Sequence, residues 1–241
     1  MPTHLVSLVT AAEHPAALAR FWAGLLGWQI AAEVPGEGTV QAPPGDGCEI
    51  GLAFVPASQP KNGKNRLHLD LSSTSVQHQR ETVARAVSLG ARPIDIGQHD
   101  VPWTVLADPE DNEFCVLEPR AEYAESGSLA AIVVDAQDPA RLARFWSSFT
   151  AWPVAADEPA ITTLRNPTGR GPALEFLRAQ TPKHGKNRLH LDIATNHDDD
   201  HAAETRRILA AGAREIGLAQ GTPGAVFADL EDNEFRLLAP R

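Results

Sequence analysis

Two histidines in identical surroundings are the first candidates for chemistry in this chain. His68 and His190 each lie in the heptamer Lys-Asn-Arg-Leu-His-Leu-Asp, at positions 64–70 and 186–192. A histidine side chain titrates near neutral pH, so it can act as a general base, a metal ligand or a hydrogen-bond partner. Asp70 and Asp192 follow two residues later, and each can orient its histidine or bind a polar group of a ligand.

The heptamer also predicts the element that positions these side chains. Leucine alternates with polar residues, which is the two-residue period of a β-strand with one apolar face. The strand places Leu67, Leu69 and Leu71 on one face and Arg66, His68 and Asp70 on the other. Seven identical residues do not recur by chance in a chain of 241, so the chain contains a duplication.

The amino-acid composition limits the classes of partner that we expect for this chain. The formal charge is −10 and lysine and arginine form no cluster, so we expect neither a nucleic-acid partner nor an anionic membrane surface. We also expect no signal peptide and no membrane span, because no segment has the required apolar length. Cys48 and Cys115 have no metal-type spacing. One disulfide between them stays open, although reduced thiols in the cytoplasm are the simpler interpretation.

The order of predicted elements is the same in both halves. Helices are expected in a segment that ends at Gly27 and over residues 76–89, 139–150 and 199–211. Strands separated by Gly- and Pro-rich turns are expected at 5–10, 28–33, 39–42, 49–55, 92–96, 103–107 and 113–117, and the second half repeats them. The chain is therefore expected to be α+β, with four βαβββ modules in a first domain (1–119), a linker (120–128) and a second domain (129–241).

Three sequence features together resemble the vicinal oxygen chelate superfamily, most closely its glyoxalase-like and bleomycin-resistance-like members. They are the pentamer Leu-Ala-Arg-Phe-Trp in the first and third helices, the heptamer strand, and Asp-Pro-Glu-Asp-Asn-Glu-Phe-Cys at 108–115. The resemblance implies two tandem domains whose mixed sheets curl into cups. Members of the superfamily include glyoxalases, extradiol dioxygenases, epimerases, thiol transferases and metal-free proteins that sequester antibiotics.

In members that bind a metal, the first and last strands of each module supply ligands on the cup floor. The resemblance places the first-strand positions at Ser7, His68, Ala131 and His190, and the last-strand positions near Ala53 and Glu175 and at Cys115 and Arg236. One cup is expected per half. The first cup would then contain His68 and Cys115, and the second would contain His190 and Glu175, facing the fixed cation of Arg236. Neither set reaches the three protein ligands that zinc or non-haem iron requires.

Further polar residues on the cup walls are candidates for ligand binding. If the first and last strands of a module lie side by side, the facing pairs are Arg66–Glu113, His68–Cys115, Arg188–Glu234 and His190–Arg236. Cross-strand ion pairs account for the two Arg–Glu contacts without any chemistry. Trp103 either stacks on a planar ligand or plugs an empty cup. Its counterpart is Gly224, so the two cups are expected to differ.

Three functions stay open at this point. The first is metal-free binding of a small organic ligand, favoured by the ligands missing at Ser7, Ala131 and Arg236. The second is a lyase, isomerase or dioxygenase that uses a Zn, Fe, Mn or Ni ion held by one of the incomplete ligand sets. The third is a metal-independent acid–base enzyme that uses His68 or His190. A fused chain of this kind is expected to act as a monomeric pseudodimer or as a homodimer.

Overall fold

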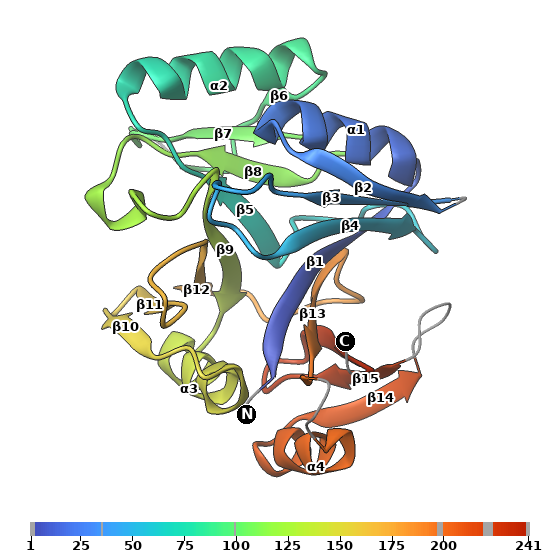
Figure 1. Ribbon diagram of the computed structural model, residues 1–241. Coiled ribbons are helices and arrows are strands. Elements are labelled where there is room, and N and C mark those ends of the chain that lie inside the picture. Colours follow the sequence, from blue (N-terminus) through green and yellow to red (C-terminus); the bar gives the residue numbers. More distant parts are fainter. Residues whose placement is uncertain (1–2, 35, 99, 197–199, 219–223, 240–241) are drawn as a thin grey trace.

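The computed structural model describes residues 3–34, 36–98, 100–196, 200–218 and 224–239, and it confirms four βαβββ modules (Figure 1). The first module comprises β1 (His4–Ala12), α1 (Pro15–Leu26), β2 (Gln29–Val34), β3 (Glu37–Gln41) and β4 (Gly51–Pro56). The second comprises β5 (Leu67–Leu71), α2 (Val76–Ser88), β6 (Arg92–Pro93), β7 (Thr104–Ala107) and β8 (Glu113–Val116).

The second half repeats this order after a single 3₁₀ turn, η1 (Ala121–Tyr123). The third module comprises β9 (Leu129–Ala136), α3 (Pro139–Thr150), β10 (Val154–Asp157), β11 (Ile161–Leu164) and β12 (Ala173–Arg178). The fourth comprises β13 (Leu189–Ala194), α4 (His201–Ala210), β14 (Arg214–Leu218), β15 (Gly224–Ala228) and β16 (Glu234–Leu238). Residue 199, where the fourth helix is predicted to begin, lies outside the described residues.

The repeated Leu-Ala-Arg-Phe-Trp segment fixes α1 and α3 against the sheets, as its apolar spacing predicts. In α1, Phe21 and Trp22 are buried, and the Trp22 ring centroid lies 5.1 Å from that of Phe114 in β8. Trp22 Nε1 donates a hydrogen bond to Asp108 Oδ2 at 3.2 Å. Trp146 of α3 does the same to Asp229 at 3.3 Å. These aromatic side chains are therefore packing and anchoring groups.

Each sheet is built from both halves of the chain, which differs from the expected one cup per half. One sheet has the strand order β14-β15-β16-β13-β1-β4-β3-β2, and the other has β10-β11-β12-β9-β5-β8-β7-β6. The central seams are the antiparallel pairs β1–β13 and β5–β9 (Figure 1). The first module thus shares a cup with the fourth, and the second with the third. The proposed boundary at 120–128 separates the repeats along the chain but does not separate the sheets.

Two ion pairs also join the halves, and they correct the predicted Arg66–Glu113 and Arg188–Glu234 pairs. Arg66 Nη2 lies 3.0 Å from Glu231 Oε2, and Arg188 Nη2 lies 2.6 Å from Glu110 Oε2. Glu113 and Glu234 instead bind Lys61 and Lys183 and the backbone N–H groups of Asn65 and Asn187. The reason is the strand register, because β5 pairs with β8 two residues away from the expected alignment.

Among the described residues, no helix combines the length and the apolar character needed to cross a membrane.

Glu231 is expected to be a main attachment between the halves. Its carboxylate accepts the N–H groups of Gln137 and Asp138 as well as pairing with Arg66, and both charged side chains are about nine-tenths buried. Replacing Glu231 by Ala leaves Arg66 without its carboxylate partner and should lower the free energy of unfolding by about 2–4 kcal/mol in urea titrations. Arg214→Ala, which breaks an exposed ion pair, should change it by less than about 1 kcal/mol. Equal effects of the two substitutions would contradict this assignment.

Candidate functional site

A cavity of about 660 Å³ opens over the sheet formed by the second and third modules. On β5, Leu67, Leu69 and Leu71 are buried in the core, while His68 and Asp70 line the cavity, as the strand period predicts. The other lining residues are Gln98, Trp103, Cys115, Leu117, Arg120, Glu122, Tyr123, Val133, Ala155, Ala156, Glu158, Ile161, Thr163, Arg165, Glu175 and Leu177.

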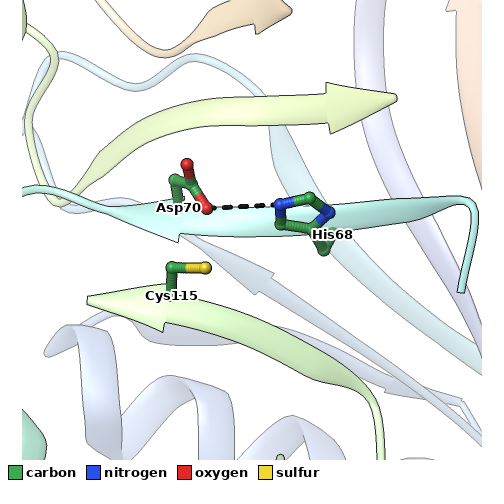
Figure 2. A group of neighbouring side chains, drawn as sticks. All are labelled: His68, Asp70 and Cys115. Carbon is green, nitrogen blue, oxygen red and sulfur yellow. Dashed lines mark ion pairs between the residues drawn. The ribbon is translucent and has the colours of Figure 1, made fainter. Parts of the chain in front are cut away.

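Three possible ligand groups meet on the floor of this cavity. The side chains of His68, Asp70 and Cys115 offer nitrogen, oxygen and sulfur atoms that all lie within 4.8 Å of one another (Figure 2). His68 Nε2 is 3.5 Å from Asp70 Oδ1 along the same strand. Cys115 of β8 stands opposite Asp70, not opposite His68 as predicted, because the parallel pairing aligns Asp70 with Cys115.

Glu175 belongs to this same cavity, which corrects its predicted place beside His190. On β9, Val133 pairs with His68 on one side and with Glu175 of β12 on the other. Glu175 is only 4% exposed, and its Oε1 accepts a hydrogen bond of 2.7 Å from Tyr123 Oη. Three of the positions where the resemblance implies metal ligands therefore face one cavity. The fourth is Ala131, which pairs with Asp70 and offers no ligand atom.

Part of the cavity wall comes from the segment predicted as a linker, and the sequence reasoning missed it. Tyr123 lies in η1, and the Arg120 guanidinium lies 5.5 Å from the Trp103 ring centroid. Arg165, which follows β11, lies 5.7 Å from the Tyr123 ring centroid. Tyr123 is the chain's single tyrosine, and this was the one available signal. Trp103 lies in the wall of this cavity, and both of its predicted roles, stacking on a planar ligand or plugging the cup, stay open.

Burial determines the protonation states of the side chains on the cavity floor. It lowers the pKa of His68 to about 4, with Lys64 adding to the shift, so the imidazole is neutral at pH 7. Burial, followed by the charge of Glu175, raises the pKa of Asp70 to about 7. It also raises the pKa of Glu175 and of the Cys115 thiol. The His68–Asp70 contact is therefore not a charged pair near neutrality, and Asp70 is the group best placed to exchange a proton there.

The donor set on the floor fits a divalent ion of the zinc type. Asp70 Oδ1 is buried, lies 3.5 Å from His68 Nε2, and has no hydrogen-bond partner among the described residues. One nitrogen, one oxygen and one sulfur ligand suit zinc, and a three-ligand site leaves coordination positions open. Binding would have to release the Cys115 proton, because the thiolate is the ligand.

The other cup has the same histidine and aspartate but a different floor. Asp192 of β13 stands opposite Arg236 of β16, and Arg236 Nε donates to Asp192 Oδ1 at 2.7 Å while a second guanidinium nitrogen contacts Oδ2. Ser7 Oγ donates to Asp192 Oδ2 at 3.4 Å. Burial, with the charge of Arg236, lowers the pKa of His190 to about 3. An internal ion pair therefore occupies the place that Cys115 and Asp70 have in the first cavity.

The remaining predicted ligand-binding residues take other roles. Arg66, Glu113, Arg188 and Glu234 form the ion pairs described above, and the structure does not bring them to the cavity floor.

Comparisons with known proteins place this fold. A family model described as a glyoxalase-like domain matches residues 7–117 and again 131–238. The crystal structure of glyoxalase I from Zea mays aligns over 98% of this chain and 92% of its own, with a TM-score of 0.69 and 14% identity. A protein from Bacillus subtilis subsp. subtilis str. 168 aligns over 99% and 85%, with a TM-score of 0.67 and 12% identity. A search of curated proteins gave no match.

The two aspartates should respond oppositely to the same substitution in chelator-treated protein. Because the pKa of Asp70 is raised in the folded state, the native protein binds its proton more tightly than the unfolded chain does. The contribution of Asp70 to stability is therefore lost as pH rises from about 4 to about 7. Asp70→Asn should raise the free energy of unfolding by roughly 2–4 kcal/mol at pH 8, with the gain shrinking toward pH 4.

Asp192→Asn is the matched control for this measurement. It leaves the Arg236 guanidinium facing a neutral amide and should lower the free energy of unfolding by about 2–4 kcal/mol at pH 8. Denaturant titrations of both variants between pH 4 and pH 8 measure the difference. The lowered pKa of His68 gives the opposite pH slope, but it is present in both the parent and Asp70→Asn and cancels in their comparison. A destabilised Asp70→Asn would refute the electrostatic description of the floor.

Proposed function

The chain belongs to the glyoxalase-like domain family, and from that premise we propose that it binds a small organic ligand in the cavity between β5–β8 and β9–β12. One observation carries the proposal: a cavity of about 660 Å³ has aromatic walls above a floor where buried Asp70 Oδ1 forms no hydrogen bond with any described residue. Binding pockets combine apolar and aromatic walls with a few convergent polar groups in this way. The cup with the Asp192–Arg236 pair is assigned a structural role.

The ligand is expected to lie between the ring of Trp103 and the floor. Trp103 Nε1 donates to Gln98 at 2.8 Å, and the Arg120 guanidinium lies 5.5 Å from the ring centroid, so the indole is held in place before a ligand arrives. Arg120 in turn is fixed by Glu118 at 2.7 Å. A held aromatic ring presents contact area with little loss of side-chain freedom on binding.

A neutral bicyclic aromatic amide, 2-naphthamide, provides the first test. Trp103→Ala should weaken its binding about tenfold, measured by isothermal titration calorimetry, because stacking and burial of the ring are lost. His68→Ala should also weaken binding, whereas His190→Ala in the other cup should leave the dissociation constant within a factor of two. An equal loss in the two histidine variants would show that the ligand does not select this cavity.

The second candidate function is a divalent-metal enzyme of the lyase, isomerase or dioxygenase type. It is favoured by the three donor atoms within 4.8 Å of one another. A bound ion would act as a Lewis acid toward adjacent oxygen atoms of a substrate. His68, Asp70 and Cys115 would hold the ion, and Glu175, aligned with them across β9, would be the neighbouring acid or base. The acid–base alternative without metal moves from the histidines to Asp70, whose pKa lies near 7.

Elemental analysis of protein purified without chelator separates the two candidates. A metal enzyme should carry about one equivalent of zinc, iron, manganese or nickel, lost in His68→Ala and Cys115→Ser but kept in His190→Ala. Absence of metal, with 2-naphthamide bound, supports the metal-free binding protein. The Cys115→Ser variant keeps the size of the side chain, so a loss of metal there reports the missing thiolate.

We further propose that the protein is a cytoplasmic monomer. Both cysteines are free, in keeping with a reducing compartment. Each eight-stranded sheet is completed within one chain, so neither cup needs a second copy.

A further inference from the structure

We propose that the ligand of the cavity carries a planar organic cation, an amidinium or guanidinium group, that pairs with Asp70. This inference rests on the small-molecule binding proposed above and names the chemical class of the ligand. It comes from a comparison of the two cups of this one chain. They share the sequence Leu-His-Leu-Asp, yet only one of them supplies a cation opposite the aspartate.

The cup of the first and fourth modules shows what such an aspartate binds. Asp192 pairs with position 236 of the neighbouring strand, and the arginine there forms a two-point contact with the carboxylate. Two parallel N–H···O bonds between a guanidinium and a carboxylate are among the stronger charge-assisted contacts in proteins. The Asp192 side chain is 3% exposed, and Arg236 neutralises its charge within the fold.

The same geometry is left incomplete at Asp70. Its register partner is Cys115, which carries no charge and offers the carboxyl group only a thiol hydrogen bond. Asp70 Oδ1 lies 3.5 Å from Nε2 of the neutral His68, and it has no hydrogen-bond partner among the described residues. The cations near the cavity are engaged elsewhere: Arg120 pairs with Glu118 and Lys64 pairs with Asp135, each at 2.7 Å. The third, Arg165, donates to Ser126 Oγ and to the backbone carbonyls of Gly171 and Glu122. Replacing an arginine by a cysteine removes the guanidinium and leaves its space to the cavity.

The charge of the surrounding wall favours a cationic ligand over an anionic one. Four carboxyl groups line the cavity, from Asp70, Glu122, Glu158 and Glu175, against the two guanidinium groups of Arg120 and Arg165. Glu175 is buried beside the floor and is held by Tyr123, so an anionic group placed there would face two buried acids. Asp70 and Trp103 line the same cavity, so a ligand with a cation attached to a ring is expected to pair with Asp70 while its ring lies against Trp103.

Three ligands with one ring system and different charges test the inference: 2-naphthamidine, 2-naphthamide and 2-naphthoate. Binding is measured by isothermal titration calorimetry at pH 8 on chelator-treated, full-length protein. The amidine should bind at least tenfold more tightly than the amide, and the carboxylate should bind most weakly. Asp70→Asn, which preserves the shape of the side chain, should reduce the amidine to the affinity of the amide.

Cys115→Arg gives an independent variant, because it transplants the arrangement of the other cup. The introduced guanidinium should pair with Asp70 and abolish the preference for the amidine, without the loss of a carboxyl group. Thermal unfolding of each variant checks that it is folded before it is titrated. His190→Ala serves as the control whose preference for the amidine should be unchanged.

The outcomes separate this inference from the function on which it rests. Equal binding of amidine and amide would overturn the cationic ligand and leave the binding function standing. Failure of all three probes to bind would overturn both. One equivalent of zinc in protein purified without chelator, displaced by none of the probes, would identify the missing cation as a metal ion and overturn the organic cation. A preference for the amidine that disappears in both Asp70→Asn and Cys115→Arg supports the proposal.

Discussion

The antiparallel seams β5–β9 and β1–β13 are the contacts on which the rest of the structure depends. Each seam joins a strand of the first half to a strand of the second, so neither half holds a complete eight-stranded sheet. The pairing aligns His68 with Val133 and thereby brings β12, and Glu175 with it, to the same floor as β8 and Cys115. A different pairing of the same modules would give two cups with other contents. The Arg66–Glu231 and Arg188–Glu110 ion pairs also join the two halves.

Much of the fold is predictable because its signals are local. The alternation of Leu67, Leu69 and Leu71 depends on the two-residue period of a strand, and the buried faces of α1 and α3 depend on helical spacing. The caps are equally local, since Gly27 ends α1 in the left-handed region that suits glycine. These features follow from the geometry of one element and need no knowledge of its neighbours.

Several residues of the candidate site were singled out from the sequence, but their grouping was not predictable. Five residues of this cavity are identified in this way: His68, Asp70, Trp103, Cys115 and Glu175. However, two identical heptamers give no local reason for one module to pair with a particular partner module. The register between β5 and β8 is likewise set by the whole sheet, and an error of two residues placed Cys115 opposite His68 instead of Asp70. Tyr123 was missed because polar, irregular segments usually connect domains, while here η1 covers the cavity.

The connection between the halves has a consequence for symmetry. A chain made of two repeats passes from the first to the second once, so the segment at 120–128 can cover one cup and not the other. Two separate copies of a single repeat would have no such segment and would present two equal cups. Joining the repeats therefore distinguishes the cups before any residue on their floors changes. Tyr123 and Arg120 belong to the one cup that the connection covers, and in the other cup Arg236 neutralises Asp192 within the protein itself.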